Sequence, residues 1–357
     1  LFPYTTLFRS RLLRTNMMKK DIEGHLKKLL NKIYRNIPSG LGSKGKININ
    51  HSELNSLLDN GLNWALDKDY ATEKDLEHCE ENGCLSDADS DLVSQKAKNR
   101  GINQVGSLGS GNHFLEIQKV DKIFNKEVAK KLGIFSKDQV TVMIHTGSRA
   151  MGHQICTDSL RMVERAMNKY NIEVPDRELA CVPANTKEAN KYLSQMACAA
   201  NFGFCNRQLI THWVRESFEQ VLNQSTDDMD MNLIYGVCHN ILKKEEHEIN
   251  GKKRKLNIHR KGATRCFPAN HPEIPQDYQS IGQPALIPGT MGSASYLCIG
   301  KPKAMDLSFG STAHGAGRQM SRRGADRRWR ASDVIKHLNS QGILIKSSSM
   351  KTVAEEA

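Results

Sequence analysis

Three short apolar segments of this chain each carry a histidine at one end, and this repeated pattern limits how the chain can fold. The pairs are His113 with residues 114–117, His145 with residues 140–144, and His239 with residues 233–237. Apolar and β-branched side chains in runs of this length predict β-strands. The histidines lie far apart in the sequence, so only the fold could bring them together.

Considered together, the three histidines predict a metal site. Neutral imidazoles, combined with a carboxylate or a thiolate, bind Mn²⁺, Zn²⁺ or Fe²⁺. A metal beside phosphate-binding turns suggests metal-assisted phosphoryl or nucleotidyl transfer. Any single member of the set also has a simpler explanation as a structural histidine, so the prediction depends on the repetition of the pattern.

A glycine-rich stretch near the C-terminus, residues 307–322, carries a fourth histidine, His314. Its glycines can adopt positive φ angles and its hydroxyls can donate hydrogen bonds to an anion; these residues are Gly310, Gly315, Gly317, Ser311 and Thr312. An imidazole facing a phosphoanhydride can act as a nucleophile, because a phosphorus–nitrogen bond divides one difficult displacement into two easier ones. The alternative is a glycine-rich turn with a structural histidine.

The composition favours a polyanionic partner. The chain of 357 residues has 51 Lys and Arg against 39 Asp and Glu and a net charge of +12, with a pI of about 9.2, which suits RNA or DNA. No apolar run approaches the roughly 18 residues that a membrane span needs. The nine cysteines fit a reducing compartment better than a disulfide framework. We expect a cytoplasmic protein with no membrane partner; the nucleus is the alternative if the source is a eukaryote.

Helical periodicity accounts for most of the remaining chain. Apolar residues recur at helical spacing in the ranges 21–37, 53–66, 157–170 and 186–221. The last of these ranges is long, and Gly203 predicts a break in it. Residues 335–345 predict a final helix followed by a strand.

Two further segments have the chemistry of nucleotide or phosphate contacts. Residues 251–265 are dense in positive charge, and they are either a solvated hairpin turn or a phosphate-contacting segment. Residues 282–300 combine a Pro-Gly turn with strands on both sides, where hydroxyls such as those of Thr290 and Ser295 could hydrogen-bond a nucleotide.

Several long motifs, in the same order, closely resemble the RtcB family of RNA-splicing ligases. They are GSLGSGNHFLEI, VMIHTGSRAMGHQICTD, NFGFCNRQ, YGVCHNILKKEEH, HRKGATRCFP, GQPALIPGTMGSASY and LSFGSTAHGAGRQMSR. The resemblance implies an α+β fold in which mixed sheets flanked by helices surround one metal and guanylate cleft. It also implies an enzyme that uses GTP and Mn²⁺ to join RNA ends bearing 2′,3′-cyclic phosphate or 3′-phosphate to 5′-hydroxyl ends, in tRNA splicing and RNA repair.

The resemblance assigns roles to individual residues. His314 is implied to be the guanylylated nucleophile, and His113, His145 and His239 the manganese ligands. Guanylate contacts are implied for Asn112, His113, Phe114, Leu115, Glu116, His239, Asn240, Pro288, Gly289, Thr290, Met291, Ser295, His314, Gly315, Ala316 and Gly317. RNA or phosphate contacts are implied for Arg149, Arg260, Lys261 and Arg265.

Both ends of the chain depart from the family pattern. In the family, an Asp-x-x-Cys-Gly segment precedes the RLLRTN motif, and its aspartate and cysteine complete a two-manganese site. Thr5 and Phe8 occupy those places here. Neither side chain can replace a carboxylate or a thiolate, and three neutral imidazoles alone would bind metal weakly. The chain also ends at Ala357, before the family's terminal Lys-Gly.

We therefore expect residues 1–10 to be a foreign leader and residues 11–357 to be a single catalytic domain truncated at both ends. Ligase activity should be impaired, and an activating helper protein or a ligase complex is a further expected partner. The alternative is a catalytically silent RNA- or nucleotide-binding component of a complex. A metal phosphatase that uses the same cleft is a third possibility.

Overall fold

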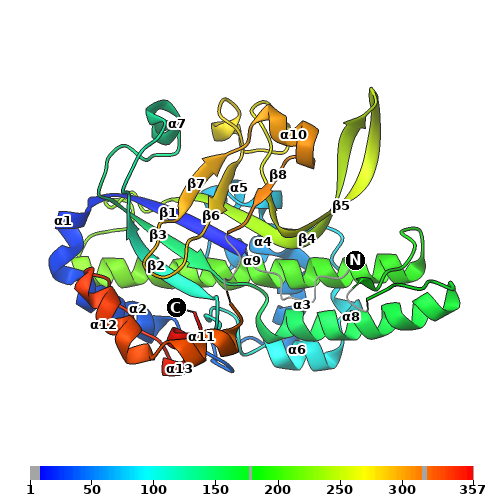
Figure 1. The fold of residues 1–357 in the computed structure, drawn as a ribbon, viewed down its shortest axis with the longest axis horizontal. Helices are drawn as coiled ribbons and strands as arrows, with labels where there is room; N and C mark the ends of the chain where they lie inside the picture. The colour runs from blue at the N-terminus through cyan, green and yellow to red at the C-terminus, as the bar shows by residue number, and fades with distance from the viewer. Residues whose placement is uncertain (1–8, 177–178, 316–319, 357) are drawn as a thin grey trace.

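The computed structural model describes residues 9–176, 179–315 and 320–356. Its strands are β1 (Arg9–Met18), β2 (Phe114–Lys119), β3 (Gln139–His145), β4 (Leu233–Ile249), β5 (Lys252–Arg265), β6 (Pro284–Ile287), β7 (Tyr296–Ile299) and β8 (Ser311–Ala313). A six-stranded sheet has the order β2-β3-β1-β4-β5-β8, and β6 pairs with β7 in a smaller sheet. Long helices run beneath the large sheet (Figure 1). The predicted α+β class is confirmed.

The sheets are antiparallel rather than mixed. Each pairing between the named strands is antiparallel, and the parallel pairing in the described residues consists of two isolated bridges. The reason is clearest at the turn between β4 and β5, where Asn250 and Gly251 have φ angles of 51° and 73°. Two such residues form the hairpin turn that directly joins antiparallel strands. The basic segment, for which a hairpin turn and a phosphate-contacting segment were both open, is therefore mostly the strand β5 that follows the turn.

The principal helices are α1 (Lys19–Ile22), α2 (Leu26–Asn36), α3 (His51–Asn60), α4 (Leu62–Asp67), α5 (Glu73–Glu77), α6 (Gln95–Gly101), α7 (Lys126–Lys131), α8 (Arg149–Lys169), α9 (Lys187–Leu222), α10 (Pro302–Ser308), α11 (Arg322–Arg328), α12 (Ala331–Ser340) and α13 (Met350–Glu355). The predicted helix over 53–66 is divided at Gly61 into α3 and α4. The strand predicted at the end of 335–345 does not form: Ile343 and Leu344 lie outside the sheets, and each is more than a third exposed.

Helix α9 is the central support of the sheet. The Thr186 side chain caps its first turn by accepting a hydrogen bond from the Ala189 N–H, and Asn223 ends it in a left-handed conformation. The break predicted at Gly203 is absent, since the helix is continuous over 36 residues. Phe202 and Phe204 on either side of this glycine are fully buried. Packing on several faces outweighs the helix penalty of about 1 kcal/mol for one glycine.

Strand β1 lies in the middle of the large sheet, between β3 and β4. Its pairing places Ser10 opposite His145 on one side and Val237 on the other. Ser10 is buried, so this residue of the predicted leader belongs to the fold. Thr5 and Phe8 lie outside the described residues. Within those residues, no helix combines the length and the apolar character needed to cross a membrane.

A buried ion pair joins α5 to α9. Asp75 is 1% exposed and accepts hydrogen bonds from both Arg215 Nη atoms at 2.7 and 2.8 Å and from Gln208 Nε2 at 2.9 Å. Gln208 in turn accepts a hydrogen bond from Arg11 of β1. Burial alone would raise the pKa of Asp75, but the hydrogen bonds and charge of Arg215 outweigh it and lower that pKa to about 2.

Replacement of this carboxylate should destabilise the fold in a pH-dependent way. The Asp75 carboxylate has a lower pKa in the folded state than in the unfolded state, where it is about 4, so it stabilises the fold at pH values above 4. This stabilisation is lost as the pH falls toward 2 and the carboxylate is protonated. We expect Asp75→Asn to lower the free energy of unfolding at pH 7 by about 2 kcal/mol or more. The difference should narrow between pH 4 and pH 2 in urea titrations. Asp121→Asn, at an exposed carboxylate, is the matched control, and an equal loss in it would contradict the interpretation.

Candidate active site

The antiparallel register gathers the predicted histidines along one side of the sheet. Phe114 of β2 and Ser10 of β1 flank His145 at the end of β3. On β4, His239 pairs with Thr264 of β5, whose other neighbour is Thr312 of β8. His314 follows β8 directly. The register of β4 shifts just after His239, where Asn240 takes a positive φ of 58°, as at a β-bulge.

Three of the four imidazoles, those of His145, His239 and His314, form a continuous row. The ring centroids of His145 and His239 are 5.4 Å apart with nearly parallel planes. Those of His239 and His314 are 4.4 Å apart with planes at 88°. His113 lies beside Gly109. A Cβ added to Gly109 would lie 2.5 Å from the His113 ring and 2.7 Å from Arg149 Nη1. Only glycine allows the loop to pass this close to both side chains.

The imidazoles of His113, His145 and His314 are neutral at neutral pH. Burial, then the nearby His314 and Arg207, lower the pKa of His145 to about 3. Burial and Arg149 hold the pKa of His113 well below its ordinary value. Burial and Lys261 lower the pKa of His314 as well. Neutral imidazoles are the form that binds metals and attacks phosphorus.

Two hydroxyls that the sequence analysis missed orient the rings. Ser10 Oγ and His145 Nδ1 form a hydrogen bond of 2.8 Å, and Thr146 Oγ1 and His113 Nδ1 form one of 2.7 Å. Such bonds to Nδ1 fix the ring and assign Nε2 to any ligand. The only sequence signal for Thr146 is its position next to His145. The contact between Ser10 and His145 could be found only from the strand register.

Arg149 begins α8 as a buried cation among neutral partners. Its guanidinium donates to Ser107 Oγ at 3.1 Å, the Gly40 carbonyl at 3.1 Å and Ser43 Oγ at 2.9 Å. Burial lowers its pKa to about 10. In residues 9–176, 179–315 and 320–356, no carboxylate forms an ion pair with it. A buried cation of this kind is stabilised by an anion such as phosphate.

The other predicted phosphate-binding residues are placed differently. Arg260 is buried and makes a two-pronged ion pair with Glu245, at 2.5 and 2.9 Å. Arg265 is buried and pairs with Glu81 and Glu273. Each guanidinium would have to leave a carboxylate to reach a phosphate, so these ion pairs argue against a role for either residue in RNA contacts. Lys261 is exposed beside the His314 loop.

The predicted guanylate-binding segments meet through a hydrogen-bond chain. Gln118 Nε2 donates to Glu116 Oε2 at 2.7 Å and to Ser295 Oγ at 3.4 Å. Ser295 Oγ also accepts from the Gly289 N–H at 3.0 Å. An added Cβ on Gly315 would lie 3.3 Å from the Pro288 carbonyl, so the His314 loop borders the same turn. Gln118 was not predicted.

The remaining residues predicted to contact the guanylate differ in burial and in their neighbours. Phe114 stacks on His145 with ring centroids 5.1 Å apart. Asn240 is buried, and its Oδ1 accepts a hydrogen bond from the Gly262 N–H. Asn112 and Thr290 are exposed, whereas Leu115 and Met291 are partly buried. Ala316 and Gly317 lie outside the described residues.

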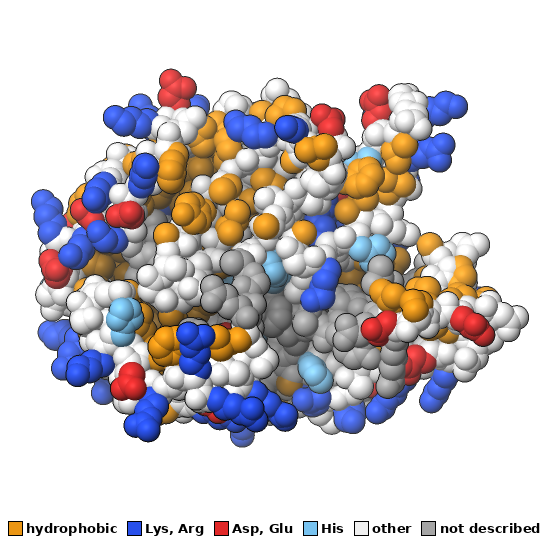
Figure 2. Space-filling view, in the orientation of Figure 1, with side chains coloured by type: hydrophobic (Ala, Val, Ile, Leu, Met, Phe, Trp, Pro, Cys, Tyr) orange, Lys and Arg blue, Asp and Glu red, His pale blue; other side chains and the backbone are white. Residues whose placement is uncertain are grey.

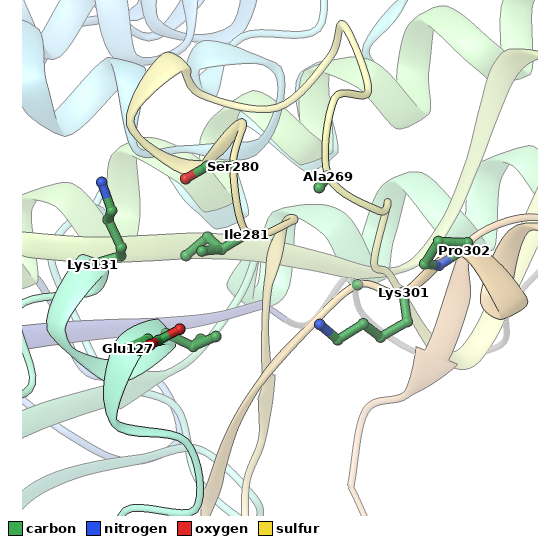
Figure 3. A pocket seen from close by; sticks show the side chains of 9 residues that line it. Glu127, Lys131, Ala269, Ser280, Ile281, Lys301 and Pro302 are labelled. Carbon is green, nitrogen blue, oxygen red and sulfur yellow. The ribbon is translucent and has the colours of Figure 1, made fainter.

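In the part of the chain that the structure describes, the metal donors that the row itself supplies are imidazoles. Among the described side chains, no group of three or more His, Cys, Asp or Glu is arranged to hold an ion. The histidine row therefore fits only part of a manganese site. A cavity of about 360 Å³ between α7 and the loop 269–281 (Figure 3) is a separate feature, lined among others by Glu127, Lys131 and Lys301. None of the predicted site residues lines it.

The sequence model of the tRNA-splicing ligase RtcB family matches residues 9–357. The chain belongs to the RtcB family. The tRNA-splicing ligase RtcB of Methanococcus maripaludis is 54% identical over 346 residues, which cover 97% of this chain and 72% of that protein. The Thermococcus kodakarensis RtcB is 52% identical with the same coverage. The Pyrococcus abyssi RtcB is also 52% identical, but the chain spans only 38% of it. The predicted membership is confirmed.

The pKa of Glu116 should depend on its hydrogen bond with Gln118. Burial raises the pKa of Glu116, and the hydrogen bond from Gln118 partly opposes that rise. We expect Gln118→Leu to raise the pKa of Glu116 further, because the carboxylate loses a donor. NMR titration of the glutamate side-chain carbonyls would measure this shift. Gln220→Leu, at an exposed position of α9, is the control; an unchanged Glu116 pKa in Gln118→Leu would contradict the assignment.

Proposed function

We propose that this RtcB-family chain carries the catalytic centre of an RNA ligase. The reaction joins an RNA end with 2′,3′-cyclic phosphate or 3′-phosphate to a 5′-hydroxyl end. The observation that carries the proposal is the position of His314. Its imidazole is neutral, it lies edge-on against His239, and its buried Nδ1 has no hydrogen-bond partner among the described residues. A structural histidine would normally use that nitrogen.

His314 acts as the nucleophile. Its nitrogen attacks the α-phosphorus of GTP, the bond to the β-phosphate oxygen breaks, and pyrophosphate leaves while the imidazole gives up its proton. Water first opens a 2′,3′-cyclic phosphate to a 3′-phosphate, where the RNA end carries one. An oxygen of the 3′-phosphate then displaces the imidazole, which regains a proton, and takes the guanylate. The 5′-hydroxyl of the second RNA attacks that activated phosphate, and GMP leaves. The low pKa of His314 favours the first step, because only the neutral ring has a lone pair to donate.

The surrounding residues hold the phosphates and the base. Arg149 supplies a buried positive charge for a phosphate, and Lys261 adds an exposed one. Glu116, Gln118, Ser295 and the Gly289 turn hold the guanylate. Mn²⁺ held by Nε2 atoms of His113, His145 and His239 would neutralise phosphate charge. RNA is the partner, as tRNA halves or broken RNA in the cytoplasm, with an accessory protein as a further partner.

One observation favours the alternative, a catalytically silent RNA- or nucleotide-binding component. The described donors near the histidine row include no carboxylate or thiolate grouped with it. Nucleotide and RNA could then bind without transfer.

The deciding experiment measures transfer of guanylate to the protein. The chain is incubated with α-³²P-labelled GTP and Mn²⁺, as it stands and with Thr5→Asp and Phe8→Cys introduced. We expect acid-labile label, stronger with the two substitutions, and none in His314→Ala. His337→Ala, at an exposed histidine of α12, should keep the label.

The outcomes separate the two functions. Label that persists in His314→Ala would place the nucleophile elsewhere. No label in any form, with nucleotide binding retained, would favour the silent binding protein.

A further inference from the structure

Helix α11 and the residues after it form an exposed basic surface that contains a tryptophan. We call this the α11 surface; its members are Arg323, Arg327, Arg328, Trp329 and Arg330, all of them exposed. Trp329 is 43% exposed, whereas Trp64 is 4% exposed and Trp213 is partly buried. Trp329 is thus the most accessible indole of the three in the chain. Asp326 is the only acidic residue of α11.

The chemistry of this surface suits unpaired nucleotides. The Arg328 guanidinium carbon lies 5.3 Å from the centroid of the Trp329 ring. An aromatic face beside guanidinium groups can stack on a base while the cations hold the backbone phosphates. A duplex keeps its bases stacked on one another, so this combination favours single strands.

The α11 surface is continuous with the candidate active site. Arg322, the first residue of α11, lies against Gly111, where an added Cβ would be 2.5 Å from its Nη2. Gly111 belongs to the loop that carries His113. Arg322 is also held by Glu356 at 3.0 Å, so the start of α11 is fixed beside this loop. The seven residues of α11 span about 10 Å, a distance of a few nucleotides.

The charge distribution on this face agrees with such a path. Lys and Arg side chains gather along the lower edge of the molecule in Figure 2, where α11 and α13 lie in Figure 1. The β4–β5 hairpin, which also has a basic tip of Lys252, Lys253, Arg254 and Lys255, projects from the opposite side in Figure 1. Its strands carry facing carboxylates such as Glu246, which pairs with Lys253 at 3.0 Å.

We propose that the α11 surface binds the single-stranded segment of RNA next to the end that is being ligated. Trp329 stacks on an unpaired base, and Arg323, Arg327, Arg328 and Arg330 contact phosphates. The inference rests on the proposed function, because it takes the bound polymer to be the ligation substrate. It adds a defined binding surface outside the histidine row.

The test is a titration of the protein with a short single-stranded RNA that ends in a 3′-phosphate. Tryptophan fluorescence should be quenched on binding, and Trp329→Phe should remove most of the change while it keeps most of the affinity. Trp329→Ala should weaken binding about tenfold. The double variant Arg327→Gln/Arg328→Gln should reduce the slope of log affinity against log salt by about 0.7 for each phosphate that the protein no longer neutralises.

The controls separate this inference from the proposed function. Arg254→Gln, at the hairpin tip, should leave the affinity unchanged. Trp329→Ala should also leave labelling of His314 by GTP unchanged, since Trp329 is not among the residues assigned to the guanylate. If Trp329→Ala binds the RNA as tightly as the parent chain, the α11 surface is not the binding site. The proposal is also contradicted if Arg254→Gln is the only variant that weakens binding. It is likewise contradicted if duplex RNA binds as tightly as single-stranded RNA and its binding also depends on Trp329. If no variant is labelled by GTP, that result would count against the proposed ligase function. The RNA titration would still show whether the α11 surface binds RNA.

Discussion

The pairing of β1 between β3 and β4 is the constraint on which the rest of the site depends. The register brings Ser10 beside His145, and the same strand holds β4 at the distance that allows the His145 and His239 rings to stack. A shift of one residue would turn every side chain of β1 to the other face of the sheet. Ser10 would then leave His145, and Leu12 and Leu13 would exchange the two sides of the core on which they lie.

Buried charge also makes the positions of β4 and β5 specific. Glu80, in a short helical turn at Glu80–Gly83, accepts hydrogen bonds from the Cys238 N–H at 2.6 Å and from Lys243. Arg265 on β5 is paired with Glu81, whose pKa Lys243 and Arg265 lower to about 2 against the effect of burial. Each of these charges is satisfied only when β4 and β5 occupy their present positions, because an unpaired buried charge costs several kcal/mol. Arg265 is therefore held in this buried network by its carboxylate partners.

The local sequence pattern predicted most helices and strands, but it predicted less well which residues would surround each side chain. The strands that carry His113, His145 and His239 were recognised from apolar runs, because strand formation by such runs is a local property. The unbroken α9 was missed at Gly203, since burial on several faces overrides the propensity of one residue. The motifs predicted which residues gather, but not that Arg260 and Arg265 would meet Glu245 and Glu81, which are distant or cross-strand partners. Ser10, Thr146 and Gln118 were missed for the same reason: each acts through a contact that only the register creates.

The strand register sets His145 beside His239, and His314 lies against His239. We propose that His113 joins them in one site, and Mn²⁺ tests this proposal most directly as a paramagnetic probe. Histidine ring signals would be followed by NMR while small amounts of Mn²⁺ are added to the intact chain. Signals of His113, His145, His239 and His314 should broaden together, while those of the exposed His51, His153 and His337 stay sharp. Broadening of the exposed histidines first, or of the four at unrelated Mn²⁺ concentrations, would contradict a single site.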